Sequence, residues 1–273
     1  MGLSINQNIA AVNSYRNLSN TQNDQAKSLE KLSSGFRINR AADDAAGLAI
    51  SEGLRSQVGG LKVAARNAQD GISVVQTAEG ALTEVHAILQ RVRDLAVQGA
   101  NDSNNDEARA NIKTEIDSLG DELTRIADST NFNGKDLLKG GTATFQVGAG
   151  STAANDQIVV NLADISTLGA TVKALEVGSA ADALTSIEAL DTQIGAVSTA
   201  RAELGAYQNR LEHTIKNVNV SIENLSASES RIRDTDMAQE MSNLSRAQIL
   251  SQAGTAMLAQ ANQIPQGVLQ LLR

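Results

Sequence analysis

Apolar residues recur every three or four positions between residues 72 and 98. The repeat runs through Val75, Ala78, Leu82, Val85, Leu89, Val92 and Ala96. This spacing places the apolar side chains on one stripe of a helix and is typical of the seam along which two helices pack. Ile88 and Leu95 widen the stripe. The pattern therefore predicts one long helix packed along another.

A second seam of the same kind lies in the carboxy-terminal half. Its apolar members are Ile187, Leu190, Ile194, Val197, Leu204, Leu211, Ile215, Val218, Ile222 and Leu225. Arg201 and Gln208 interrupt it. Polar residues in a seam lower stability but penalise wrong registers, so these two can fix the alignment of the helices. Alternatively, the Arg201 stem extends out of the seam and keeps its charge in water.

The hydrophobic period changes in the middle of the chain. The polar stretch 101–106 predicts a loop between antiparallel helices, and a turn of Asn and Gly at 131–134 ends the helix that follows. Residues 140–169 are rich in Gly, Ala, Ser and Thr. Within them, the runs 142–147 and 157–162 predict the strands of a hairpin. We therefore expect a small β region between two long helical halves.

The two ends of the chain carry narrower apolar stripes. Their members are Ile5, Ile9 and Val12 at one end and Leu250, Met257, Ile264, Val268 and Leu271 at the other. Burying one large apolar side chain contributes about 1.5–3 kcal/mol, whereas ordering one backbone residue costs about 1–2 kcal/mol. We therefore expect both ends to be largely disordered in an isolated copy and to become helical on meeting each other and neighbouring copies.

Composition narrows the possible functions. The 273-residue chain has no Cys, two His, 2% aromatic residues and a net charge of −8. The lack of Cys excludes disulfides and thiolate chemistry, and the acidic balance disfavours nucleic acid as a partner. His86 and His213 have no second His nearby in sequence, which is typical of helix-surface residues rather than catalytic or metal-binding ones. We predict no enzymatic activity, no cofactor and no metal site.

The length of the first seam predicts an elongated molecule. At a rise of about 1.5 Å per residue, a helix from residue 60 to residue 100 spans roughly 60 Å, more than the width of a compact domain of this mass. No apolar run approaches the roughly 20 residues needed to cross a bilayer, so we expect no membrane insertion. The predicted fold is mainly α, a long coiled-coil-like helical rod with paired amino- and carboxy-terminal helices and a small β-hairpin in the middle.

Four stretches resemble the terminal regions of bacterial flagellins. Residues 31–61 begin KLSSGFRINRAADDAAG, and residues 68–100 begin AQDGISVVQTAEG. Residues 204–215 read LGAYQNRLEHTI, and residues 229–273 begin ESRIRDTDMAQEMSNLS. The matches occur at both ends of the chain and in the order that the family has.

This resemblance implies a structural subunit that polymerises into the helical bacterial flagellar filament used for swimming. The flagellar type III apparatus would export it unfolded, without a cleaved signal peptide, and the chain would be added at the filament tip outside the cell. Segments 1–44 and 230–273 would form an inner domain called D0. Segments 45–139 and 181–229 would form a helical domain called D1, with 140–180 as a short surface region.

The resemblance also implies partners. Besides other copies of the subunit, these are a flagellar secretion chaperone that would bind residues 234–273, the filament cap and the hook–filament junction proteins. The vertebrate Toll-like receptor 5 recognises some flagellins through residues that align with Arg91, Leu95 and Glu115; Asp94 stands where many family members have Glu. The family also carries O-linked glycans, for which the candidates are Thr142, Thr144, Ser151 and Thr152.

Two alternative functions stay open at this point. A hook–filament junction protein shares the same terminal helices but assembles in few copies. A chemoreceptor-like signalling hairpin is also long and poor in aromatic residues, but it needs a membrane anchor and an uninterrupted hairpin, whereas residues 140–169 break the helical pattern.

Overall fold

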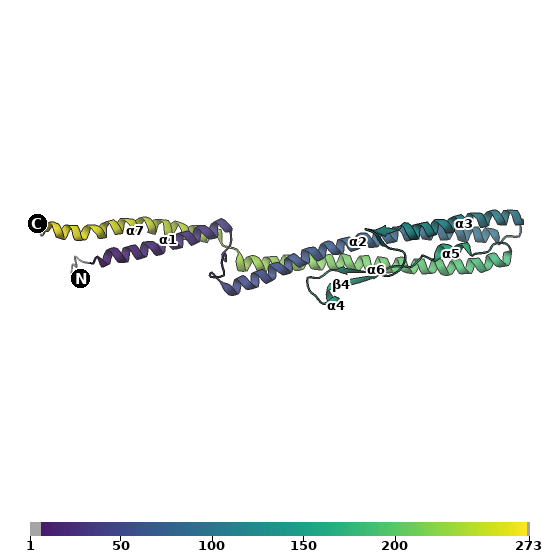
Figure 1. Ribbon diagram of the computed structural model, residues 1–273, viewed down its shortest axis with the longest axis horizontal. Helices are drawn as coiled ribbons and strands as arrows, with labels where there is room; N and C mark the ends of the chain where they lie inside the picture. The colour runs from purple at the N-terminus through teal and green to yellow at the C-terminus, as the bar shows by residue number, and fades with distance from the viewer. Residues whose placement is uncertain (1–6, 272–273) are drawn as a thin grey trace. The chain divides into compact units, whose positions relative to one another are not determined.

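The computed structural model describes residues 7–271, and their side chains as far as residue 263. The chain is mainly helical, as predicted (Figure 1). The long helices are α1 (Ile9–Ser34), α2 (Ala45–Gly99), α3 (Asp106–Ser129), α6 (Ala180–Arg233) and α7 (Met237–Leu271). The short elements are β1 (Asn131–Phe132), β2 (Lys135–Asp136), β3 (Thr142–Gln146), α4 (Ala153–Asp156), β4 (Gln157–Asn161) and α5 (Leu168–Lys173).

The chain divides into two units. Unit 1 comprises Met1–Ser56 and Asn224–Arg273, and unit 2 comprises Gln57–Glu223. Both divisions fall inside long helices, α2 and α6, whereas the predicted domain boundaries lie at residues 44/45 and 229/230. The expected D0 and D1 ranges therefore stay predictions.

The core of unit 2 lies between α2, α3 and α6. The α2 seam residues Val75, Leu82, Val85, Leu89 and Val92 are fully buried. In α6, Leu190 and Leu211 are buried, while Ile187, Ile194 and Ile215 are half-buried against the same core. Ile116 and Leu123 of α3 belong to this core too. One apolar stripe on α2 is thus covered from two sides, by α3 and by α6.

A hairpin of β3 and β4 packs onto this helical core. The two strands are antiparallel, with Thr142 opposite Asn161 and Gln146 opposite Gln157. Side chains alternate along them: Ile158 and Val160 are buried, and Val159 between them is exposed. The predicted hairpin is confirmed, and its strands begin at the predicted residues.

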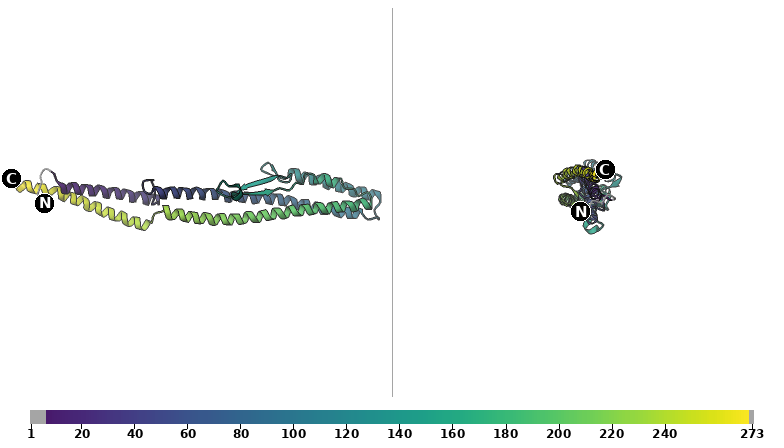
Figure 2. Two further views of the ribbon diagram at one scale, coloured as in Figure 1. Left: turned by 90° about the horizontal axis from the view of Figure 1, so that it is seen from below. Right: turned by 90° about the vertical axis from the view of Figure 1, so that its left-hand side faces the viewer.

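Unit 1 contains the pair of terminal helices. α1 and α7 lie side by side along their length (Figure 2). Their contact is thin, because α1 buries only Leu18 and Ser28. Asn8 caps α1, since its side chain accepts from the Ala11 amide, and its Nδ2 also donates to the Ala261 carbonyl of α7 at 2.7 Å. The helices are paired, but little apolar surface holds them together.

Candidate interaction surfaces

Large apolar side chains stay exposed on the terminal helices. Ile9 and Val12 of α1 are 66% and 67% exposed, and Leu250 and Met257 of α7 are 52% and 61% exposed. Among the described side chains, the other exposed large apolar ones of this pair are Tyr15, Leu29, Met237, Met241 and Ile249. Ile5 lies outside the described residues, as do the side chains of Ile264, Val268 and Leu271. We call the exposed set the terminal apolar residues.

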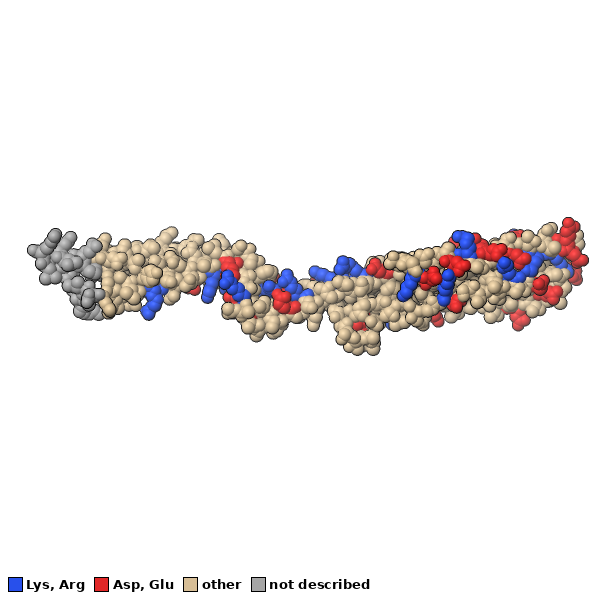
Figure 3. Space-filling view, in the orientation of Figure 1, with Lys and Arg blue, Asp and Glu red and all other residues tan. Residues whose placement is uncertain are grey.

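Charged side chains on the visible face are also unevenly distributed along the chain. Figure 3 shows few charged side chains over α1 and α7, whereas the part formed by α2 and α3 carries many of both signs. Exposed apolar side chains with few charges around them mark interaction surfaces in soluble proteins, because water contact with them is unfavourable. The terminal helices are therefore the best candidate surface for association.

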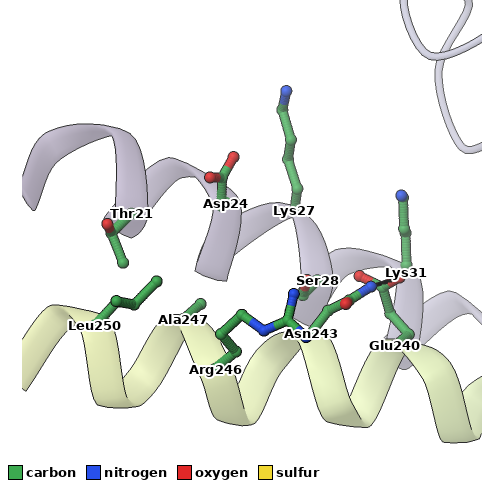
Figure 4. Close-up of a pocket in the computed structure, with 10 residues that line it drawn as sticks. All are labelled: Thr21, Asp24, Lys27, Ser28, Lys31, Glu240, Asn243, Arg246, Ala247 and Leu250. Carbon is green, nitrogen blue, oxygen red and sulfur yellow. Dashed lines mark hydrogen bonds between the residues drawn. The ribbon is translucent and has the colours of Figure 1, made fainter. Parts of the chain in front are cut away.

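A polar groove of about 330 Å³ interrupts the contact between α1 and α7. Buried Ser28 of α1 and buried Glu240 of α7 line it, and Arg246 reaches from α7 toward α1 (Figure 4). Lys27 and Lys31 extend away from α7 in the same view. The Glu240 carboxylate accepts from Asn243 of its own helix at 3.4 Å. Buried polar groups in a helix pair disfavour shifted registers, so this groove helps to fix the alignment of α1 and α7.

The three residues aligned with the receptor contact differ in their exposure to solvent. Arg91 of α2 and Glu115 of α3 form an exposed ion pair, in which Nε and Nη2 of Arg91 donate to one Glu115 oxygen at 3.0 and 2.7 Å. Leu95 is only 2% exposed and belongs to the core. Its side chain is thus part of the apolar stripe of α2 that the core of unit 2 covers. The structure therefore leaves Arg91 and Glu115, but not Leu95, accessible to a partner.

Ion pairs across unit 2 connect α2 to α6. Arg93 Nε donates to Asp191 Oδ1 at 2.6 Å, and this guanidinium lowers the pKa of the Asp191 carboxyl below its usual value. Arg201, which interrupts the α6 seam, lies 3.8 Å from Glu79 of α2. Gln208 instead donates to Glu212 of its own helix. The contact of Arg201 favours a role in alignment, and that of Gln208 does not.

The structure also locates the residues considered for chemistry. His86 is half-buried beside Gln90, at 2.9 Å, and His213 is exposed. Across residues 7–271, no group of three His, Asp or Glu side chains is placed to hold a metal ion. In that same part of the chain, none of the helices combines the length and the apolar character required to cross a membrane. The four glycan candidates, Thr142, Thr144, Ser151 and Thr152, are all exposed.

Sequence reasoning missed the contacts around Arg233 and around Arg109. Arg109 donates to the Gly178 carbonyl at 3.1 Å and so ties α3 to the segment before α6. Arg233 meets Phe36, which lies 197 positions earlier in the chain. No hydrophobic period relates residues so far apart.

Known proteins are similar to this chain over nearly its full length. A family model described as the bacterial flagellin N-terminal helical region matches residues 5–143, and one described as the bacterial flagellin C-terminal helical region matches residues 187–272. The chain is 52% identical over 270 residues to flagellin of Halalkalibacterium halodurans, covering 98% of this chain and 99% of that protein. It is 51% identical over 305 residues to Bacillus subtilis flagellin, with the same two shares. The crystal structure of Bacillus cereus flagellin is 35% identical, has a TM-score of 0.50, and covers 60% of this chain and 94% of its own.

Proposed function

Because this chain belongs to the bacterial flagellin family and is a structural, non-enzymatic subunit of the extracellular flagellar filament, we propose that its terminal apolar residues form contacts between copies. The flagellin relatives match it over nearly its full length, so the junction-protein and signalling-hairpin alternatives are set aside. The proposal concerns which surface of the subunit makes the filament.

One observation carries this proposal. α1 and α7 pair, yet side chains such as Val12 and Leu250 stay more than half exposed. Apolar side chains that are exposed to solvent stabilise a helix pair only when another surface covers them. Further copies of the same pair offer a surface of the same chemistry, which is how a symmetric polymer buries a repeated patch.

A polymerisation assay with a matched pair of leucine variants tests it. Leu250→Ser removes an exposed leucine from α7, and Leu184→Ser removes one from α6 that is 63% exposed. We expect Leu250→Ser to slow seeded filament growth, measured by light scattering and electron microscopy, by about tenfold or more, since each large apolar contact contributes about 1.5–3 kcal/mol. Leu184→Ser should grow at the parent rate. Equal growth of both variants would show that Leu250 is not in a contact between copies.

The other partners are proposed on narrower grounds. The exposed apolar side chains of α7 fit a helix-in-groove contact with a secretion chaperone before polymerisation, because the same side chains are free only in the monomer. The cap and the hook–filament junction proteins would meet the ends of the filament through the same terminal helices. Co-purification of the full chain with each partner, with Leu250→Ser as the weakened variant, tests these contacts.

The exposed Thr142, Thr144, Ser151 and Thr152 are accessible for O-glycosylation. The mass of the chain isolated from native filaments measures whether glycans are attached.

Recognition by Toll-like receptor 5 would depend on the Arg91–Glu115 pair. Both side chains are about half exposed, whereas Leu95 is buried in the core. We expect Arg91→Gln to lower receptor activation by monomer at least tenfold, because charge-assisted bonds contribute about 1.5–3 kcal/mol each. Arg93 lies on the same helix as Arg91 and pairs with Asp191 of α6. Arg93→Gln breaks that exposed pair, is the matched control and should keep full potency. Undiminished signalling by Arg91→Gln would contradict the proposal.

A further inference from the structure

Two short connecting segments of unit 1 lie together at the ends of the terminal helices. One follows α1: Gly35 adopts a left-handed φ of 74°, which only glycine adopts readily, and its N–H donates to the Lys31 carbonyl at 2.8 Å. The other lies between α6 and α7. Phe36 pairs with Asp234 in an antiparallel bridge. The Arg37 amide donates to the Arg233 carbonyl at 2.6 Å, and the Thr235 amide donates to the Gly35 carbonyl at 3.0 Å.

The side chain of Arg233 crosses this junction. Its guanidinium lies over the Phe36 ring, 4.8 Å from the ring centre, within the roughly 6 Å at which a cation is attracted by the ring face. Its Nη1 donates to Glu52 of α2 at 2.5 Å. Arg233 therefore touches three parts of unit 1: the segment after α1, the first turns of α2 and the end of its own helix.

Arg233 is far more buried than an ordinary helix-end arginine. Its side chain is only 12% exposed, and its Nε has no hydrogen-bond partner within the described part of the chain. A guanidinium so removed from water needs compensation, which here comes from the ring and the carboxylate. Its position in the last turn of α6 is also favourable, because a positive charge there meets the negative end of the helix dipole.

We propose that Arg233 is a positioning residue, which joins the two connecting segments and thereby sets α1 and α7 side by side from a fixed starting point. Once the segments are joined, pairing of the terminal helices no longer requires closure of a loop of almost 200 residues, which is an entropic cost. This matters because the pair itself buries so little. The inference rests on the proposed function only in that α1 and α7 carry the contacts between copies.

Neighbouring Arg231 provides a matched control. It also lies in the last turn of α6, so it meets the same helix dipole, but it is exposed and donates only to Ser228 Oγ of its own helix, at 3.1 Å. Arg231→Lys therefore changes an arginine at the same helix end without touching Phe36 or Glu52. Any general effect of charge or helix propensity appears in both variants.

A double-mutant cycle on the monomeric full chain tests the proposal. Arg233→Lys keeps the charge but loses the planar group, and Phe36→Leu keeps an apolar side chain but loses the ring face. The measurement is hydrogen exchange at the Arg37 and Thr235 amides, which bridge the segments. We expect each single variant to speed exchange about three- to tenfold, and the double variant to be no faster than the faster single one, because the ring and the guanidinium act together. Arg231→Lys should exchange like the parent.

Two further results decide the role of the ring. Phe36→Tyr keeps the aromatic face and should restore parent exchange, which a merely apolar role for Phe36 does not require. Effects of Arg233→Lys and Phe36→Leu that simply multiply in the double variant would overturn the proposal, as would equal effects of Arg231→Lys and Arg233→Lys. None of these measurements depends on filament growth. Failure of the Leu250→Ser polymerisation test would thus leave this result standing, and the reverse holds too.

Discussion

At the scale of single residues, a close approach between α3 and α5 depends on two glycines. Gly169 of α5 faces Gly120 of α3: a Cβ placed on Gly169 would lie 2.6 Å from the Gly120 carbonyl oxygen and would also meet Thr124. A backbone carbonyl cannot move aside as the tip of a flexible side chain can. The adjoining polar contacts, from Lys173 to Asp121 at 2.8 Å and from Lys113 to the Lys173 carbonyl at 2.7 Å, hold α5 in this place.

This geometry predicts opposite effects for the same substitution at two sites. Gly169→Ala should lower the free energy of unfolding by about 1–3 kcal/mol, because the new methyl group forces α5 away from α3. Gly195→Ala, in the exposed interior of α6 with nothing within 4 Å of the added Cβ, should raise it by about 0.5–1 kcal/mol through helix propensity. Guanidinium unfolding followed by circular dichroism measures both. A stabilising Gly169→Ala would show that α5 does not lie against α3 as described.

At the scale of elements, the sequence predicted the helices and strands that have a regular hydrophobic period. The seam of α2 and the strands β3 and β4 follow regular periods, so their existence and their inward faces could be read from residues such as Leu82 and Val160. The short helix α5 could not, because six residues are too few to show a period. Leu95 illustrates the limit within a correctly predicted helix: the pattern shows that it is apolar and at the edge of the stripe, but only the fold shows that its side chain is buried.

The contacts that join separate elements were the least predictable. Arg201 interrupts a seam in sequence, yet its function in alignment depends on Glu79 of another helix. Phe36 and Arg233 carry no local signal at all, since each stands in a short irregular or helix-end segment whose partner lies almost 200 residues away. Pairwise chemistry between distant residues follows from the fold, and a hydrophobic pattern constrains only the faces that meet.

At the scale of the whole molecule, stability is distributed unevenly between the units. Unit 2 has a continuous apolar core drawn from α2, α3, α6 and the hairpin. In unit 1, α1 has 26 ordered residues, of which only Leu18 and Ser28 are buried. At about 1–2 kcal/mol of conformational entropy per residue, we expect so little burial to leave α1 and α7 close to unfolding in an isolated copy. The proposed contacts between copies, which would cover Val12, Leu250 and their neighbours, would supply the missing apolar contact.

Amide hydrogen exchange should therefore be much faster in α1 than in α2 in the monomer, and this difference should largely disappear in the filament. In the monomer, we expect amides of α1 between residues 12 and 30 to exchange at least about a hundredfold faster than those of α2 between residues 82 and 92, because opening of the thin helix pair costs little free energy. In the filament the α1 amides should slow by about a hundredfold or more, while the α2 amides change little, since their core is complete in one copy. Strong protection of α1 in the monomer would mean that the terminal helices are stable without neighbouring copies. The polymer would then gain contacts without completing the fold of its subunit, and filament growth and the ordering of α1 would be separate events.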